Sequence, residues 1–273
     1  MPEGPEVRIE SNKLNKVLSG RVPDSIWFEK TSLKRKASRL KGKKILKVTS
    51  LGKAILCCFE SDHFIYSHNQ LYGKWVILPV EAELNSNRIV RIILTSRNKK
   101  AVLYSASSIE ILDLKDLEKH SYISRLGPDV LDKNIDHKMI FSRLTHKKFR
   151  NRAFASLYLD QGFLAGIGNY LRTEILWSAG LSPFGTPSKT PEQKLKKLAK
   201  FSLSIPRRSL ETNGWTLTET QKKKFSKEKS RFAVFARQGK KCLSCDARIN
   251  KIYISGRRLY KCDNCQPIIQ SSD

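Results

Sequence analysis

The sequence predicts an α+β protein with more than one domain. Three observations support this prediction. Short segments with strand-like alternation fill residues 43–112, and from about Ser124 onward the apolar residues recur at helical spacing. Two Cys-x2-Cys pairs then flank a hairpin-like segment near the C-terminal end. A chain of 273 residues is long enough for two domains, or for one large domain with an appendage.

The N-terminal part is predicted to be a β-sandwich or barrel closed by one leading helix. Pro5 suits the first turn of a helix that runs to about Leu18, and Gly20 is a typical stop. Cys57 and Cys58 lie in an apolar run and are expected to be buried core residues. The expected strands span residues 43–50, 54–60, 63–67, 74–78, 89–95, 101–105 and 109–112.

The middle part is predicted to be a small helical domain. Helical spacing covers residues 139–144 and 171–178, and a segment led by Pro191 carries apolar residues through Phe201. After Pro206 the chain becomes polar and Lys-rich, and Lys222–Lys224 is expected to be a mobile basic loop. The expected domains are residues 1–123, 124–215 and 232–273.

The charge indicates a nucleic-acid partner. Lys and Arg number 52 against 25 Asp and Glu, for a net charge of +27. A basic surface attracts the phosphate backbone whatever its sequence, although ribosomal and membrane-surface proteins are basic too. The 40% hydrophobic content indicates a folded chain rather than a basic tail. Without an apolar run of roughly 18 residues or a signal peptide, a soluble intracellular protein is expected.

The spacing of four cysteines predicts a metal site. Each Cys-x2-Cys pair places two thiolates on one tight turn, and a hairpin with its turn at Ser255–Gly256 would bring the two pairs together. Four thiolates suit one structural Zn²⁺ per chain, while a redox pair or free thiols is the alternative. The expected ligands are Cys242, Cys245, Cys262 and Cys265.

Two further segments could carry chemistry. Removal of Met1 would leave Pro2 as a secondary amine beside Glu3 and Glu6, a nucleophile of the kind that forms Schiff bases; the plainer interpretation is a helix start. Gly162–Tyr170 places three glycines and Asn169 before a helix. Such a turn could bind a phosphate through backbone N–H groups, or it could be a purely structural glycine turn.

Taken together, these motifs resemble the formamidopyrimidine-DNA glycosylase and endonuclease VIII family, most closely its bacterial endonuclease VIII branch. The resemblance implies an N-terminal β-sandwich with a leading helix, a helix-two-turn-helix domain and a C-terminal zinc-finger hairpin. The matching segments span essentially the whole chain: residues 1–6, 51–54, 67–73, 126–129, 160–171 and the four-cysteine hairpin ending in Cys265-Gln266.

The resemblance implies a bifunctional DNA glycosylase and AP lyase of base excision repair. Pro2 would attack C1′ of the damaged nucleotide, and the iminium formed would drive β,δ-elimination of the two phosphates. Glu3 would be the general acid and base, and Glu6 would shape the pocket or the proton path. Lys53 would contact a phosphate near the lesion; from spacing alone it would be a solvated turn residue.

Further resemblance-based roles concern DNA binding. Asn169 and Arg257 would hold phosphates flanking the lesion, Arg257 from the expected hairpin tip, where a solvated turn charge is the alternative. Gln70, Leu71 and Tyr72 match the wedge triplet of the endonuclease VIII branch, which would fill the space left by an extruded base and which favours oxidised pyrimidines. Alternation in a β-rich segment is the plainer interpretation of Leu71 and Tyr72.

Two other function classes stay open at this stage. One is an 8-oxoguanine and formamidopyrimidine glycosylase, although residues 215–231 do not resemble the lesion-covering loop of purine-specific relatives. The other is a noncatalytic zinc-finger DNA-binding protein, against which the retained Pro2, Glu3 and Lys53 argue. The expected partner is damaged double-stranded DNA, bound by a monomer. The expected location is the cytoplasm, with the nucleoid, in a bacterium, or the nucleus in a eukaryote.

Overall fold

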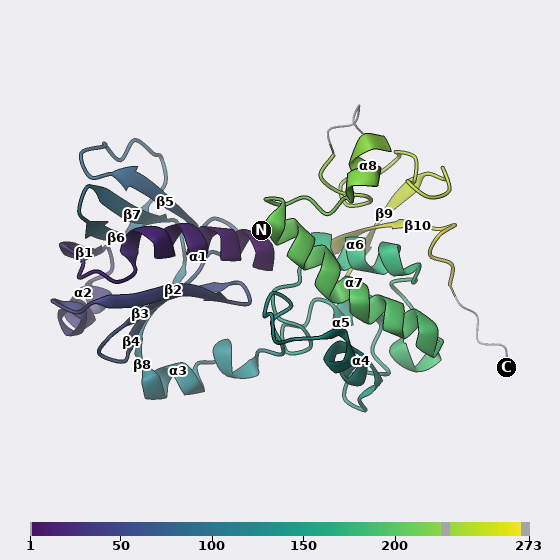
Figure 1. The fold of residues 1–273 in the computed structure, drawn as a ribbon, viewed down its shortest axis with the longest axis horizontal. Coiled ribbons are helices and arrows are strands. Elements are labelled where there is room, and N and C mark those ends of the chain that lie inside the picture. The colour runs from purple at the N-terminus through teal and green to yellow at the C-terminus, as the bar shows by residue number, and fades with distance from the viewer. Residues whose placement is uncertain (1, 225–229, 269–273) are drawn as a thin grey trace. The chain divides into compact units, whose positions relative to one another are not determined.

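The computed structural model describes residues 2–224 and 230–268 and divides the chain into two compact units, Met1–Arg125 and Leu126–Asp273 (Figure 1). Parts of two predictions lie outside the described residues: the end of the expected zinc-finger domain at 269–273, and residues 225–229 of the Lys-rich segment.

The first unit is a sandwich of two four-stranded antiparallel sheets, in the orders β1-β6-β7-β5 and β2-β3-β4-β8. Helix α1 (Gly4–Leu18) contributes Val7, Leu14 and Leu18 to the core, where they join apolar side chains of both sheets. The predicted sandwich, leading helix and seven strands are confirmed. The unit also contains β1 (Ser25–Phe28), which was not among the seven. The predicted strands are β2 (Ile45–Leu51), β3 (Ala54–Phe59), β4 (His63–His68), β5 (Lys74–Pro79), β6 (Val90–Ser96), β7 (Lys99–Tyr104) and β8 (Ser108–Asp113).

Several short elements of this unit were not predicted. Strand β1 buries only Phe28 of its four residues, and helix α2 (Thr31–Ala37) buries only Leu33 of its seven. A single buried side chain does not define a hydrophobic periodicity, so the sequence pattern alone could not predict either element. The others are η1 (Ser38–Leu40), α3 (Leu114–Lys119) and η2 (Ile123–Arg125).

Three segments meet at one end of this sandwich. Helix α1 and strand β2 run in opposite directions, since Ser19 near the end of α1 donates to the Leu46 carbonyl and Arg8 near its start donates to Ser50. The start of α1 therefore lies beside the β2–β3 turn. Ala54 pairs with His68, which places the β4–β5 connection at the same end.

The second unit packs helices around one core and carries the C-terminal hairpin. Side chains of α4, α6 and α7 form the main core, and a second cluster surrounds the cysteines. No described helix is long and apolar enough to cross a membrane. The elements are α4 (His137–Thr145), α5 (Phe154–Leu157), α6 (Asn169–Ala179), η3 (Pro187–Lys189), α7 (Glu192–Glu211), α8 (Glu219–Lys224), β9 (Ile249–Ile254) and β10 (Arg257–Cys262).

Helix α7 continues through Pro206 to Glu211, because buried Ser209 and partly buried Leu210 extend its core-facing side beyond the proline. One expectation for this unit was wrong. Lys222–Lys224 end helix α8 rather than forming a loop. Thr218 and Gln221 explain α8: each side chain bonds the other's backbone N–H, at 3.2 and 2.9 Å, in a capping box that the sequence pattern Thr-x-x-Gln already carries.

Candidate functional site

The N-terminal residues are fixed by the first turn of α1. Glu3 is the N-cap of α1 and is only 3% exposed, and Pro2 beside it is partly buried. The Glu3 N–H donates to Glu6 Oε2 at 3.0 Å in a reciprocal capping box. Glu6 thereby fixes the backbone from which Pro2 projects. The plainer interpretation of this motif, a helix start, is confirmed, and this helix start also buries a carboxylate beside Pro2.

The first turns of α1 are tied to the β2–β3 turn. Arg8 Nε donates to Ser50 Oγ at 2.6 Å, and Arg8 Nη2 donates to the Ser50 carbonyl at 3.3 Å. Ser50 lies three residues before Lys53. A planar guanidinium that bonds both the side chain and the backbone of one residue holds the two segments in a defined register.

Lys53 is not a solvated turn residue. It is 7% exposed, it follows Gly52 at a φ of 56°, and its backbone N–H donates to the Tyr122 hydroxyl at 2.9 Å. The ring of Tyr122 meets His68 edge-on, with centroids 5.2 Å apart. Burial, followed by the Lys53 charge, lowers the pKa of His68 to about 4. Near neutral pH an uncharged imidazole therefore lies close to the Lys53 cation.

The β4–β5 connection presents two apolar side chains to solvent. Leu71 is 64% exposed and Tyr72 is 72% exposed. Gln70 before them adopts a φ of 48°, in the left-handed region, and its side chain accepts a hydrogen bond from the Ser107 hydroxyl. These residues form a tight turn rather than alternating strand positions, so strand packing does not explain their apolar character.

That exposed turn has a rigid base. The Glu10 carboxylate accepts from the side-chain amide of Asn69 and from the Trp75 N–H, the latter at 2.8 Å, and burial raises the pKa of Glu10. The Gly73 backbone lies close to the Asn69 backbone, since a Cβ atom at Gly73 would come within 2.6 Å of it. Residues 70–72 are therefore held by buried contacts on both sides.

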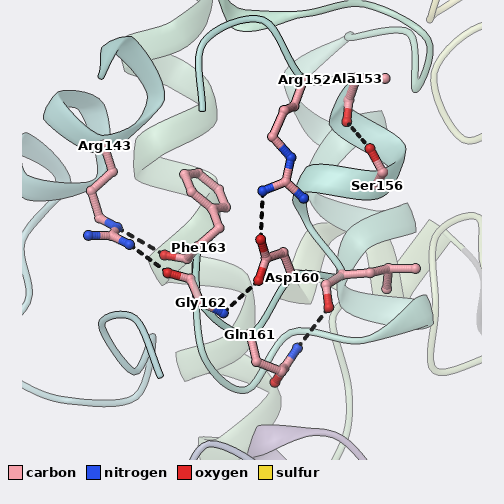
Figure 2. Close-up of polar contacts among 9 residues, drawn as sticks. Arg143, Arg152, Ala153, Ser156, Asp160, Gln161, Gly162 and Phe163 are labelled. Carbon is pink, nitrogen blue, oxygen red and sulfur yellow. Dashed lines mark hydrogen bonds and ion pairs between the residues drawn. The ribbon is translucent and has the colours of Figure 1, made fainter. Parts of the chain in front are cut away.

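In the second unit, hydrogen bonds from side chains hold the glycine-rich turn of residues 160–168 in place (Figure 2). Asp160 accepts from Arg152 at 2.6 Å and from the Gly162 N–H at 2.8 Å. Arg143 donates to the Gly162 and Phe163 carbonyls at 2.6 and 2.9 Å. A turn braced in this way presents the start of α6 in one conformation.

The Leu126–Asp129 motif packs against the same turn. The Gly127 N–H donates to the Gln161 carbonyl at 2.9 Å, and the Ala165 N–H donates to the Pro128 carbonyl at 3.0 Å. A Cβ atom at Gly127 would lie 2.5 Å from the Gly162 carbonyl oxygen. The motif therefore needs glycine because two backbone segments touch there.

Helix α6 begins with Asn169 after the N-cap Gly168. Arg172, fully buried, donates to Asn169 Oδ1 at 3.3 Å, to the Ala155 carbonyl at 2.7 Å and to the Arg258 carbonyl at 3.0 Å. Because a guanidinium only donates, this contact uses the acceptor end of the Asn169 amide and leaves its Nδ2 donor for another acceptor. Arg172 joins Asn169 to the hairpin.

Arg257 lies at the hairpin tip, as the sequence predicted. It opens β10 opposite Ile254, and Ser255 and Gly256 between them adopt φ values of 49° and 71°. Two successive left-handed residues form the tight turn typical of hairpins. Arg257 is exposed, and the neighbouring Arg258 carbonyl is the acceptor of Arg172. One buried guanidinium thus links the two segments that carry Asn169 and Arg257.

The four cysteines form a cluster that is able to bind one metal ion. Their Sγ atoms all lie within 4.8 Å of one another, with individual separations of 3.4 and 3.7 Å. Four thiolates about 2.3 Å from a tetrahedral Zn²⁺ would be about 3.8 Å apart, so the set fits such an ion. Trp177 Nε1 also donates to Cys242 Sγ at 3.4 Å, as expected around a thiolate ligand.

Sequence reasoning missed the buried charges that join these parts. Glu174 on α6 is 1% exposed, and its oxygens accept from the backbone N–H groups of residues 233, 234 and 235 and from the Thr216 hydroxyl. Helix α6 buries every residue from Tyr170 to Trp177. An Arg and a Glu within an otherwise apolar helix were the available signal, because such charges are rarely buried unless they are paired.

Known proteins match the chain along its length. A model of the formamidopyrimidine-DNA glycosylase N-terminal domain matches residues 1–107, and a model of the H2TH domain of the same glycosylase matches residues 126–221. Endonuclease 8 of Escherichia coli O6:K15:H31 is 41% identical over 97% of this chain and 100% of its own length. Endonuclease 8 of Klebsiella pneumoniae is 40% identical over the same shares.

Solved structures share the fold at lower identity. The structure of MutM in complex with DNA that contains carbocyclic 8-oxo-G superposes with a TM-score of 0.82, at 21% identity, over 98% of this chain and 100% of that one. A Lactococcus lactis Fpg bound to DNA with an abasic site gives a TM-score of 0.81 at 20% identity, over 97% and 100% of the two chains.

Proposed function

Because this chain belongs to the formamidopyrimidine-DNA glycosylase and endonuclease VIII family, we propose that it removes oxidised pyrimidines from double-stranded DNA with Pro2 as its nucleophile. The chain is a bifunctional DNA glycosylase and AP lyase of base excision repair, as its full-length match to endonuclease 8 shows. The observation that carries the pyrimidine assignment is the exposed turn of residues 70–72. This turn lies at the end of the sandwich where α1 begins, which is called the catalytic end below.

Pro2 would act once Met1 has been removed. Its secondary amine forms a bond to C1′ while the bond from C1′ to the damaged base breaks, and the base leaves with that electron pair and takes up a proton. The amine loses its proton, the bond from C1′ to the ring oxygen breaks as that oxygen takes up a proton, and a cationic iminium forms between Pro2 and C1′. The iminium withdraws electrons, so loss of the C2′ proton expels the 3′ phosphate. A second elimination expels the 5′ phosphate. An amine that is unprotonated near neutral pH suits the first step.

Glu3 would transfer the protons near the sugar. Its burial at 3% exposure and its fixed position in the capping box hold one carboxylate beside Pro2. A positioned general acid or base typically contributes about 10²–10⁴ in rate. Glu6 supports this role by fixing the backbone of Glu3. Lys53 would bind a phosphate near the lesion, and Tyr122 holds its backbone at the same end of the sandwich.

The wedge would come from the β4–β5 turn. An extruded nucleotide leaves a gap in the duplex, and extrusion costs a few kcal/mol. Leu71 can fill that gap, Tyr72 can stack on a neighbouring base and Gln70 can bond the orphaned base. Their exposure on a rigid turn supports this assignment, since an apolar pair in water is otherwise unfavourable.

The second unit would bind the phosphates that flank the lesion. Arg257 offers a bidentate guanidinium, Asn169 offers an amide donor, and Arg172 fixes the distance between the segments that carry them. The cysteine cluster would hold one structural Zn²⁺, because four thiolates leave no open position for catalysis. When bound, the metal would supply rigidity to the hairpin that carries Arg257.

The bacterial relatives support the proposed cytoplasmic location with the nucleoid, and we propose that the enzyme acts as a monomer. An 8-oxoguanine glycosylase is the second candidate, because the solved neighbours include a complex with 8-oxo-G DNA.

Single-turnover excision from matched duplexes that carry dihydrouracil or 8-oxoguanine separates the two. We expect faster excision of dihydrouracil, and at least a tenfold loss on that duplex in Leu71→Ala. The exposed Leu46→Ala, at the opposite end of β2, is the matched control and should retain the rate. Faster excision of 8-oxoguanine would refute the pyrimidine assignment.

A further inference from the structure

A second basic surface lies on the first unit, away from the residues assigned to catalysis. It is called the distal basic surface here. Residues 30–59 contain no Asp or Glu. The exposed cations of this stretch belong to α2 and its N-cap, to η1, and to the segment that leads into and begins β2. They define the surface: Lys30, Lys34, Arg35, Lys36, Arg39, Lys41, Lys43, Lys44 and Lys47.

The distal basic surface is at the opposite end of α1 from Glu3. The Gly20 N–H donates to the Ile45 carbonyl at 2.7 Å, so the start of β2 lies beside the C-terminal end of α1. Fifteen helical residues at about 1.5 Å each separate the two ends by about 22 Å. Figure 1 shows α2 at the end of the first unit away from the N label. The surface is therefore separate from Pro2, Lys53 and the wedge.

The structure gives these cations few intramolecular partners. Within the part of the chain that the structure describes, none of the nine forms an ion pair with a carboxylate. Glu29, which precedes the surface, is paired with Arg91 at 2.8 Å. A hydrogen bond from the Asp116 N–H, and to a smaller extent the Arg39 charge, lower the pKa of Asp113, so this carboxylate offsets part of the charge. The remaining excess of cations in one stretch of chain is self-repelling and destabilises the folded unit. A polyanion relieves that repulsion.

An exposed aromatic ring lies within the same surface. Trp27 on the edge strand β1 is 41% exposed, and Lys34 Nζ lies 5.8 Å from the centroid of its ring. Cations interleaved with an exposed aromatic ring are typical of nucleic-acid surfaces, where the cations meet phosphates and the ring packs on sugars or bases. Double-stranded DNA offers one negative charge per about 1.7 Å of its axis, dense enough for many of these cations at once.

We propose that the distal basic surface binds the phosphate backbone of a second DNA segment while the catalytic end holds the lesion. The contact needs no particular sequence and depends steeply on salt. Because it holds a second segment, it keeps the enzyme on DNA between excisions and allows transfer from one segment to another. This function goes beyond lesion excision and does not depend on which lesion is removed.

The test occupies the catalytic end first. The wild-type protein is saturated with a short duplex that carries a non-cleavable abasic-site analogue, and binding of a second, labelled, undamaged duplex is followed by fluorescence anisotropy at several salt concentrations. The variant carries Lys34→Gln, Arg35→Gln, Lys36→Gln and Arg39→Gln. The matched control removes four exposed charges from α7 through Lys194→Gln, Lys196→Gln, Lys197→Gln and Lys200→Gln.

We expect the wild-type complex to bind the second duplex and the α2 variant to bind it at least tenfold more weakly. The slope of log affinity against log salt should fall by about 3 to 4, at roughly 0.9 per lost phosphate contact. The α7 control should bind like the wild type. Excision from a short lesion duplex should be unchanged in the α2 variant, which shows that it is folded.

Three results would overturn the proposal. The saturated complex fails to bind the second duplex, the α2 variant binds it as tightly as the wild type, or both variants lose the same affinity, which would show an effect of net charge alone. A fourth result would also overturn it: a polyglutamate peptide that binds the saturated wild type more tightly than the second duplex at equal charge concentration would indicate an acidic protein as the occupant. If the wild-type protein did not excise the lesion, that result would count against the proposed function, and the binding of the second duplex could still be interpreted.

Discussion

Glu174 should be the charge that holds the start of the cysteine hairpin onto helix α6. Its Oε1 accepts from the N–H groups of Val234 and Phe235 at 2.8 and 2.9 Å, and its Oε2 accepts from the Ala233 N–H and the Thr216 hydroxyl at 2.8 and 2.7 Å. Glu174→Gln keeps the shape of the side chain but replaces one oxygen with a donor.

The cost of that change can be worked from these four bonds. In the less harmful orientation, the new NH₂ group faces Ala233 and Thr216. The Thr216 hydroxyl can still donate to the Arg231 carbonyl, now 3.2 Å away, but the buried Ala233 N–H loses its acceptor. An unsatisfied buried donor costs about 1–3 kcal/mol, and the two remaining bonds lose their charge-assisted part. The free energy of unfolding should fall by about 2–4 kcal/mol.

Urea unfolding followed by tryptophan fluorescence measures this loss, because Trp177 and Trp215 both lie in the cluster that contains the cysteines. Glu219→Gln is the matched control. Its carboxylate is 79% exposed and pairs with Lys222 at 2.6 Å, so its loss should cost less than about 0.5 kcal/mol. A Glu174→Gln protein within 1 kcal/mol of the wild type would refute the four-bond account of this site.

Three other changes test separate parts of the structure. Gly127→Ala should destabilise the second unit by more than about 2 kcal/mol, because its Cβ would lie 2.5 Å from the Gly162 carbonyl oxygen; calorimetry measures this, with Gly185→Ala as the comparison, since a Cβ there would come no closer than 3.4 Å to any neighbouring group. Arg172→Met should weaken binding to an abasic-analogue duplex at least tenfold while leaving the excision rate at saturating enzyme nearly unchanged; equal losses in both would contradict a positioning role. The pKa of His68 is lowered to about 4 by burial and then by Lys53, so the unfolded chain binds its proton first as the pH falls. The free energy of unfolding should then fall by up to about 1.4 kcal/mol per pH unit between about pH 6.5 and 4, a slope that His68→Gln removes and the exposed His137→Gln retains.

The sequence predicted those elements whose residues carry their own pattern. Apolar runs over 54–60 and 101–105 predicted β3 and β7, and cysteine spacing predicted a cluster whose Sγ atoms do lie within 4.8 Å. Strand β1 and helix α2 bury one side chain each and left no period. Helix α7 passes Pro206 because its buried face continues beyond the proline.

The candidate site also contains residues that the sequence singles out and residues that it does not. Leu71 and Tyr72 are singled out by the family resemblance, whereas their own pattern would place them as alternating strand positions; the structure finds both exposed. Arg172 and Glu174 could not be interpreted, because their partners lie far along the chain: the Arg258 carbonyl is 86 residues from Arg172, and the Val234 N–H is 60 residues from Glu174. Sequence spacing reports on neighbours in a helix or strand, and these contacts depend on tertiary packing.

Borohydride trapping tests the central claim most directly. Protein from which Met1 has been removed is incubated with a dihydrouracil duplex or a matched 8-oxoguanine duplex in the presence of borohydride, and the cross-linked residue is located by peptide mapping. We predict a covalent complex through Pro2 that forms faster on dihydrouracil. Trapping through a lysine, or no trapping on these duplexes or on an abasic site, would contradict Pro2 as the nucleophile.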